Sequence, residues 1–201
     1  PRLVHHLDET ARDMVADLYK RFVKDDTHVL DLMSSWVSHL PRGVNPGRVS
    51  GLGMNRTELE HNPRLTDIQV HDLNAAPVLP YENESFDVAI CSVSVEYLSQ
   101  PLDVFAEVGR VLKPGGTFVV TFSNRWFPPK VVRIWEQVHE FERVGLVLEY
   151  FLRSDAFDNL GTYSMRGLPR PRNDKYAGEL ALSDPVYAVW GQTSAPQKRT
   201  A

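Results

Sequence analysis

Side chains that can bind ligands or move protons follow several short apolar runs in this chain. Asp72, Glu96, Tyr97 and Arg125 each come just after such a run. Carboxylates and phenols exchange protons or accept hydrogen bonds, and a guanidinium suits an anion. If the runs are parallel strands, their carboxyl ends meet at one edge of a sheet, which is where such sheets bind ligands. The residues therefore predict a ligand site built from several strand ends.

The elements that position these residues alternate along the chain. Strands are predicted at residues 27–32, 48–52, 68–71, 86–91, 117–122, 146–151 and 186–190, and helices at 8–24, 34–40, 56–61, 101–112 and 130–143. Such alternation indicates a mostly parallel sheet with helices on both faces.

Composition excludes several classes of protein. The chain has 201 residues, is 42% hydrophobic and holds one cysteine, Cys91, so it can bury a core without disulfides. Cys91 ends a predicted strand, and its side chain is expected to pack in the core. A single cysteine indicates a protein of a reducing compartment, such as the cytoplasm or the soluble interior of an organelle. The net charge of -4 argues against nucleic-acid binding, and no apolar run approaches the ~20 residues of a membrane span. The sequence makes no prediction about a targeting peptide before Pro1.

Two motifs at a fixed separation point to a family. Residues 79–88 read L-P-Y-x-x-x-S-F-D-V, and residues 110–116 read R-V-L-K-P-G-G, where Pro114 ends a helix and two glycines allow the chain to reverse. Together they resemble the class I S-adenosylmethionine-dependent methyltransferases, specifically their type 11 small-molecule branch. The resemblance covers residues 27–152 and, more weakly, 186–191.

The resemblance implies an α/β fold: a doubly wound, mostly parallel seven-strand sheet with an antiparallel last strand, the Rossmann-like methyltransferase fold. It also implies S-adenosyl-L-methionine as cofactor and methyl transfer to a small-molecule acceptor. The alternative is a methyltransferase-fold protein that lacks this activity and acts as a binding or scaffold subunit. No oligomeric state is predicted.

The expected organisation is a single methyltransferase-like domain. Its parts are an N-terminal helix at 8–24, a core at 27–152, a C-terminal lid and last strand at 153–191, and a tail at 192–201. The proline-rich connection 154–184 is expected to lie over the site as a lid, and a solvated turn is the alternative for its basic residues between 166 and 175.

The first strand departs from the family at its end. Relatives follow an acidic residue with a Gly-x-Gly-x-Gly loop, whereas here Asp31 is followed by residues 33–37, M-S-S-W-V, without a glycine. Side chains there crowd a cofactor that needs close backbone approach. Ser34 and Ser35 are helix-capping residues, so a helix start can still offer amide donors to a carboxylate. An ordinary packed turn is the alternative.

The second strand departs as well. The resemblance places an acidic residue that holds the ribose hydroxyls at Gly53, and Asn55 is the nearest substitute. The Gly51-x-Gly53 pair does not predict a dinucleotide site, because Arg56 stands where a third glycine is needed.

Other family positions are retained. The resemblance places Asp72 against the adenine amino group and the Leu73 amide against the ring, although an Asp after a strand also forms turns. Ser92 begins the segment that borders the reacting methyl group in relatives. A base is needed only when the acceptor carries a proton, and Glu96 and Tyr97 are the candidates for that catalytic role. The alternatives are a solvated carboxylate at a helix start for Glu96 and a ring at the edge of the core for Tyr97.

The acceptor side is expected around two segments. Trp36 and His39 can narrow the pocket from the first loop, with core packing as the alternative for Trp36. Asn124, Arg125 and Trp126 follow the fifth strand, where relatives face the acceptor. Arg125 suits an anionic acceptor or a surface ion pair. No metal site is predicted.

Overall fold

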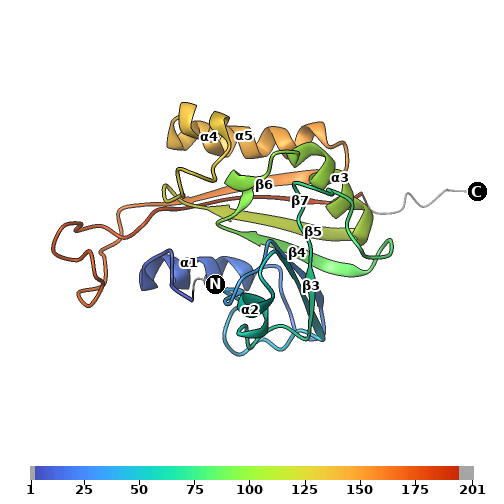
Figure 1. Ribbon diagram of the computed structural model, residues 1–201, viewed down its shortest axis with the longest axis horizontal. Helices are drawn as coiled ribbons and strands as arrows, with labels where there is room; N and C mark the ends of the chain where they lie inside the picture. Colours follow the sequence, from blue (N-terminus) through green and yellow to red (C-terminus); the bar gives the residue numbers. More distant parts are fainter. Residues whose placement is uncertain (1–2, 195–201) are drawn as a thin grey trace, which may run out of the picture.

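A seven-strand sheet forms the centre of the computed structural model, which describes residues 3–194 (Figure 1). The strand order is β3-β2-β1-β4-β5-β7-β6; β1 to β5 are parallel, and β7 runs antiparallel to both β5 and β6. The strands are β1 (His28–Leu32), β2 (Arg48–Gly53), β3 (Asp67–Val70), β4 (Phe86–Ser92), β5 (Leu112–Phe122), β6 (Asp158–Met165) and β7 (Val186–Gln192). The predicted fold class is confirmed.

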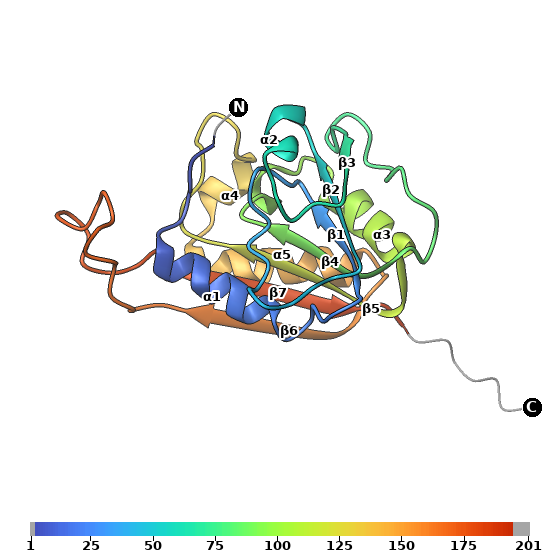
Figure 2. The same cartoon turned by 90° about the horizontal axis from the view of Figure 1, so that it is seen from below.

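Helices cover both faces of the sheet (Figures 1 and 2). The helices are α1 (Glu9–Tyr19), α2 (Arg56–Glu60), α3 (Pro101–Val111), α4 (Arg133–Gln137) and α5 (Glu140–Arg153), with a 3-10 turn η1 (Val95–Tyr97) after β4. Helices α3, α4 and α5 lie on one face, and α1 lies on the other. Asp8 caps α1, as its carboxylate accepts a hydrogen bond from the Ala11 amide at 3.1 Å.

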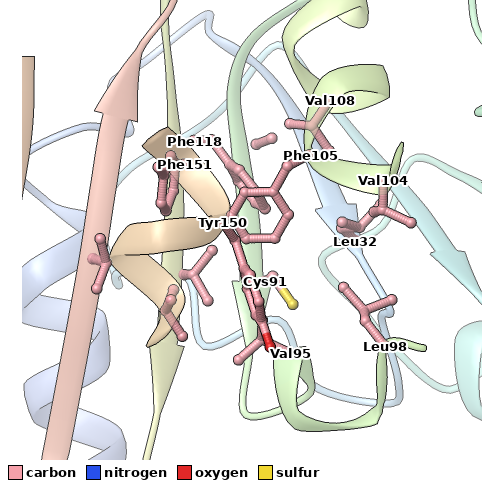
Figure 3. Packing of buried hydrophobic residues seen from close by; sticks show 14 of the residues in the cluster. Leu32, Cys91, Val95, Leu98, Val104, Phe105, Val108, Phe118, Tyr150 and Phe151 are labelled. Carbon is pink, nitrogen blue, oxygen red and sulfur yellow. The ribbon is translucent and has the colours of Figure 1, made fainter. Parts of the chain in front are cut away.

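The core under α3 and α5 is rich in aromatic rings (Figure 3). Phe105 of α3 lies 4.9 Å from Phe151 of α5 and 5.0 Å from Phe118 of β5, centroid to centroid. Truncating such a ring typically costs roughly 3–5 kcal/mol, so this cluster fixes how α3 and α5 sit on the strands. The free thiol of Cys91 is buried in the same cluster, which confirms its packing role.

The region after β5 differs from the prediction. Residues 146–151, predicted as a strand, belong to helix α5, and the predicted helix 130–143 is divided between α4 and α5. A short apolar run does not distinguish a strand from a buried helix turn. The helix is stabilised at the N-terminus of α5, where His139 and Glu142 form a capping box.

The segment expected as a lid contains the sixth strand instead. β6 pairs with β7 and forms one edge of the sheet. Residues 166–185 then lead away from the sheet as a projecting loop, orange to red in Figure 1. Of the expected tail, Gln192 ends β7, and residues 195–201 lie outside the described part of the chain.

The loop after β1 is not helical, so the predicted helix at 34–40 was wrong. Met33 and His39 have φ angles of 55° and 52°, which a right-handed helix does not allow. The Ser34 amide donates to the Leu52 carbonyl of β2 at 2.7 Å, and the Asn62 amide nitrogen donates to the Ser35 carbonyl at 2.9 Å. The loop is therefore tied to β2 and to the end of α2 by contacts distant in sequence.

Among the described residues, no helix is both long enough and apolar enough to cross a membrane.

Candidate functional site

A cavity of about 740 Å³ opens at the carboxyl ends of the five parallel strands. Its lining residues follow β1, β2, β3, β4 and β5, and the N-terminal segment before α1 completes the wall. Strand order reverses between β1 and β4, which is where a doubly wound sheet binds its ligands. The volume is typical of a small-molecule site.

All but two of the predicted site residues line this cavity. The residues expected on the cofactor side that do so are Asp31, Ser34, Ser35, Asn55, Asp72, Leu73 and Ser92. The catalytic and acceptor-side candidates that do so are Trp36, His39, Tyr97, Arg125 and Trp126.

Glu96 and Asn124 are the two exceptions. The Glu96 side chain is only 1% exposed and does not line the cavity. Burial raises the pKa of its carboxyl to about 8, and nearby Arg143 opposes that rise. Asn124 is exposed but lies outside the cavity lining. The sequence placed Glu96 and Tyr97 in the segment after β4, but it did not reveal which face of the η1 turn each side chain occupies.

At the end of β1, Asp31 lies almost fully buried at the base of the cavity. Its side chain accepts a hydrogen bond from the Ser34 hydroxyl at 2.7 Å. Burial raises the pKa of Asp31 to about 6, while the hydroxyls of Ser38 and Ser34 hold it down. Asp31 is therefore mostly charged near neutral pH and presents a carboxylate oxygen in a weakly solvated place.

The missing acid at the end of β2 has a steric cause. A Cβ atom built on Gly53 stands 2.2 Å from the Ser34 carbonyl oxygen, far inside van der Waals contact. The Ser34 amide bonds to the neighbouring Leu52 carbonyl, so the loop cannot easily withdraw. Any side chain at position 53 is excluded while the loop crosses β2 in this way.

A carboxylate absent from the sequence prediction occupies this edge of the cavity. Glu58 of α2 lines the cavity, and its carboxylate accepts a hydrogen bond from the Ser35 hydroxyl at 2.8 Å. Asn55, the predicted substitute, instead caps α2 by accepting from the Glu58 amide at 3.3 Å. The Asn-x-x-Glu spacing resembles a capping box and was the available signal for this arrangement.

Beyond β3, Asp72 forms a local turn as well as lining the cavity. Its Oδ1 atom accepts from the Asn74 amide at 2.9 Å. Asn74 in turn donates to the Tyr97 carbonyl at 2.9 Å and accepts from the Ser99 amide at 2.9 Å. The β3 and β4 sides of the cavity are therefore tied together.

At the end of β4 the backbone is strained. Val93 lines the cavity with a φ of 48°, which is rare for a β-branched residue. Its amide donates to the Thr121 carbonyl at 2.8 Å, and Tyr19 of α1 shares a hydrogen bond with the Ser92 hydroxyl at 2.6 Å. These contacts fix the shape of the segment that follows β4.

Tyr97 faces the cavity with its hydroxyl already engaged. The Phe127 amide donates to that hydroxyl at 3.0 Å. Burial, with the neighbouring Glu96 charge, raises the pKa of Tyr97 to about 12, so the phenol is protonated near neutral pH. Tyr97 is therefore suited to positioning the β5 loop and the ligand rather than to removing a proton.

Sequence reasoning missed the N-terminal wall of the cavity. Residues 4–7 line it, the Trp36 indole donates to the Val4 carbonyl at 3.3 Å, and the His5 ring lies 4.6 Å from the Trp36 ring. The His6 ring meets Phe127 edge-on at 5.1 Å. This segment spans from the β1 loop to the β5 loop, whereas no described residue of 154–184 lines the cavity.

Arg125 lies both at the cavity and beside a buried carboxylate. It lines the cavity, its Nη1 atom lies 3.6 Å from the Asp184 carboxylate, and its guanidinium lies 5.0 Å from the centroid of Tyr176. Asp184 also accepts from the Arg170 Nη2 atom at 2.7 Å, and its amide donates to Asp8 at 2.6 Å. The projecting loop is thus hydrogen-bonded to Asp8, directly after the N-terminal segment that lines the cavity.

Comparison with known proteins finds similarity to methyltransferases. Residues 43–120 match the family model of the type 11 methyltransferase domain. A malonyl-[acyl-carrier protein] O-methyltransferase from Marinomonas sp. is 29% identical over 83 residues, 38% of this chain and 31% of that relative. The chain spans less than a third of the length of the first curated relatives it matches.

Two solved structures share the fold at low sequence identity. The complex of the Haloferax volcanii Trm112 methyltransferase activator with a putative methyltransferase gives a TM-score of 0.62 at 17% identity, covering 91% of this chain and 90% of that one. The 4+2 cyclase SpnF gives 0.63 at 16% identity, covering 97% and 89%.

The strand order is that of the class I methyltransferase fold, which the solved neighbours share. Residues 43–120, less than half of the chain, are similar to the type 11 methyltransferase domain, and S-adenosyl-L-methionine is the cofactor of that class.

Proposed function

We propose that this chain transfers the methyl group of S-adenosylmethionine to a small-molecule acceptor bound in the same cavity. The observation that supports this most directly is the single cavity at the ends of β1 to β5, with carboxylates along one part of its wall and aromatic rings along another. The cofactor supplies an activated methyl group. The protein has to align the acceptor with it and exclude water.

The carboxylates suit the donor groups of the cofactor. Asp31 near the end of β1, Glu58 after β2 and Asp72 after β3 all line the cavity. An ionised carboxylate only accepts hydrogen bonds, and the cofactor's ammonium, ribose hydroxyls and adenine amino group all donate them. We assign the ribose hydroxyls to Glu58, because it stands next to the β2 end where Gly53 has no side chain.

The remaining cofactor-side residues shape the pocket around those carboxylates. Ser34 and Ser35 orient Asp31 and Glu58 through the two hydroxyl hydrogen bonds described above. We expect the Leu73 backbone to border the adenine ring and Ser92 to border the reacting methyl group. Asn55 acts through the cap that fixes Glu58.

The acceptor side is proposed around Tyr97, Trp36, His39, Arg125 and Trp126. These residues follow β1, β4 and β5, and the N-terminal segment covers them from outside. Glu96 is not assigned a role in transfer, because its side chain lies behind the cavity wall.

A second function, as a binding or scaffold subunit without methyl transfer, is favoured by one observation. The Ser34 carbonyl oxygen lies 2.2 Å from where a Cβ at position 53 would stand, so the β1 loop crowds the end of β2 on the proposed cofactor side. The structural similarity to a cyclase is compatible with a fold whose chemistry varies, since fold alone does not fix function.

Calorimetric titration with S-adenosylmethionine and with S-adenosylhomocysteine separates the two functions. We expect saturable binding with a dissociation constant between about 1 μM and 1 mM, weakened by the crowded β1 loop. The titration is followed by incubation with methyl-labelled cofactor and a panel of small acids, phenols and amines. Absence of binding at millimolar cofactor contradicts the methyltransferase proposal and supports the scaffold.

A further inference from the structure

The acceptor side of the cavity is walled by aromatic and imidazole rings. We call this set the ring wall; it consists of His5, Trp36, His39, Tyr97, Trp126 and Phe127. Its members come from the N-terminal segment and from the loops after β1, β4 and β5. Segments far apart in the sequence thus all contribute rings to the same side of the cavity.

Hydrogen bonds and stacking hold several of these rings in place. Trp36 is fixed by the Val4 carbonyl and the His5 ring, and Tyr97 is joined to the Phe127 amide. The Arg143 guanidinium lies 4.1 Å from the Trp126 centroid. Rings that are ordered before a ligand arrives lose little entropy on binding, so they favour a flat partner that can stack or meet them edge-on.

Charge divides the cavity in the same way. The carboxylates lie at or beyond the ends of the strands on the β1–β3 side, whereas two cations line the cavity after β5. The carboxylates are Asp31, Glu58 and Asp72, and the cations are Arg125 and Lys130. Asp184 lies 3.6 Å from Arg125, but a guanidinium has five N–H donors and retains others for a ligand. The ring side of the cavity therefore favours an anion.

The titrating groups of the ring wall are poor bases near neutral pH. The Tyr97 phenol stays protonated, and the half-buried position of His39, beside Arg12, lowers its pKa to about 4. Burial and Arg12 also lower the pKa of His5. An acceptor atom that already lacks a proton fits such a site better than an alcohol or an ammonium does.

We propose that the acceptor is an aromatic carboxylate, seated against the ring wall and methylated on a carboxylate oxygen. This inference rests on the proposed methyl transfer. One carboxylate oxygen forms a bond to the methyl carbon as the carbon–sulfur bond breaks, and the electron pair of that bond stays on sulfur. The products are a methyl ester and S-adenosylhomocysteine, and no proton has to be removed. Arg125 and Lys130 at the rim attract the anion, and they attract the neutral ester less, which favours its release.

The test uses three bicyclic probes: 2-naphthoate, its neutral counterpart 2-naphthamide, and saturated decahydronaphthalene-2-carboxylate. Each is titrated calorimetrically into the protein with and without saturating S-adenosylhomocysteine. Stacking against two rings predicts that naphthoate binds about tenfold more tightly than the saturated acid. Charge predicts that it binds several-fold more tightly than the amide, with a smaller ratio at high salt.

Matched charge variants test the rim. Lys130→Gln should reduce the ratio of naphthoate to naphthamide affinity, whereas Arg172→Gln, an exposed position on the projecting loop outside the cavity, should leave the ratio unchanged. With S-adenosylmethionine present, mass spectrometry should detect methyl 2-naphthoate.

The outcomes separate this inference from the proposed function. Equal affinity for all three probes in a protein that binds S-adenosylhomocysteine overturns the aromatic carboxylate and leaves methyl transfer standing. Naphthoate selectivity without cofactor binding supports the ring site but overturns the transfer. Methylation of amines or alcohols but of no carboxylate also overturns the inference.

Discussion

Adding a side chain at Gly53 should displace the β1 loop and weaken cofactor binding. In the family pattern an acidic residue stands at position 53. From that pattern alone, Gly53→Asp is expected to restore a contact to the ribose and to tighten cofactor binding. The structure predicts the opposite, because a Cβ there meets the Ser34 carbonyl oxygen at 2.2 Å. Gly53→Asp and Gly53→Ala therefore test whether the space beside Gly53 is free for a side chain or is already occupied by the Ser34 carbonyl.

The size of the effect follows from the contact. The Ser34 carbonyl has to retreat by roughly 1 Å to reach ordinary van der Waals separation, and overpacking of this kind costs about 1–3 kcal/mol. Moving Ser34 also strains its 2.7 Å hydrogen bond to Leu52, and breaking a buried bond costs roughly 1–3 kcal/mol more. A total near 3 kcal/mol lowers the Tm of a domain of this size by about 6–12 °C.

Thermal melting and cofactor titration on the same samples measure both effects. Gly145→Ala is the control, because nothing lies within 4 Å of a Cβ built there and the residue is in helix α5. That change should stabilise the protein by up to ~1 kcal/mol. If Gly53→Asp melts like the wild type and binds S-adenosylmethionine more tightly, the steric explanation of the missing acid is wrong.

Three further changes test individual side chains. Glu58→Gln should weaken binding of S-adenosylhomocysteine about tenfold while Glu60→Gln on the same helix does not, since a hydrogen bond to a charged group is worth roughly 1.5–3 kcal/mol; equal titrations for the two variants remove Glu58 from the site. Asp72→Asn should weaken adenosyl ligands without loss of fold, whereas unchanged affinity with a lower Tm identifies Asp72 as a turn residue only. The Glu96 carboxyl has a pKa of about 8 when folded against an ordinary value of 4.5, so the folded protein binds this proton more tightly than the unfolded chain does, and the resulting stability is complete below about pH 4.5 and is lost as the pH rises towards 8. Glu96→Gln should therefore raise the Tm relative to wild type at pH 8 and change it little at pH 4.5, and a pH-independent difference contradicts the buried acid.

The sequence predicted the parallel part of the sheet well because its signals are local. Strands at 48–52, 68–71, 86–91 and 117–122 are short β-branched or apolar runs bounded by turns, and their observed bounds differ by one or two residues, except for β5, which begins earlier, at Leu112. The strand ends then located the cavity, since that follows from parallel topology alone. The errors after β5 arose where a short apolar run fits either a strand or one face of a helix.

The cavity wall was harder to predict because distant contacts build it. The β1 loop takes its shape from hydrogen bonds to Leu52 and Asn62, neither of which the pattern M-S-S-W-V indicates. Residues 4–7 carry no periodic pattern, so their place over the cavity depends on Trp36 and on the buried Asp8 network. Side-chain direction within η1 separates Tyr97 from Glu96 and is likewise set by packing.

The absent glycines and the ring wall have one structural origin. Because the β1 loop crosses to β2 instead of forming a helix, it fills the space beside Gly53 and also directs Trp36 and His39 into the cavity. A loop of glycines leaves room on the cofactor side and contributes no ring to the acceptor side. The same departure that crowds the cofactor therefore gives the acceptor a firmer surface. Variants of Trp36 should reveal this link: Trp36→Ala should change acceptor-probe affinity more than a core truncation of equal destabilisation, such as Val147→Ala in α5, and equal effects of the two contradict it.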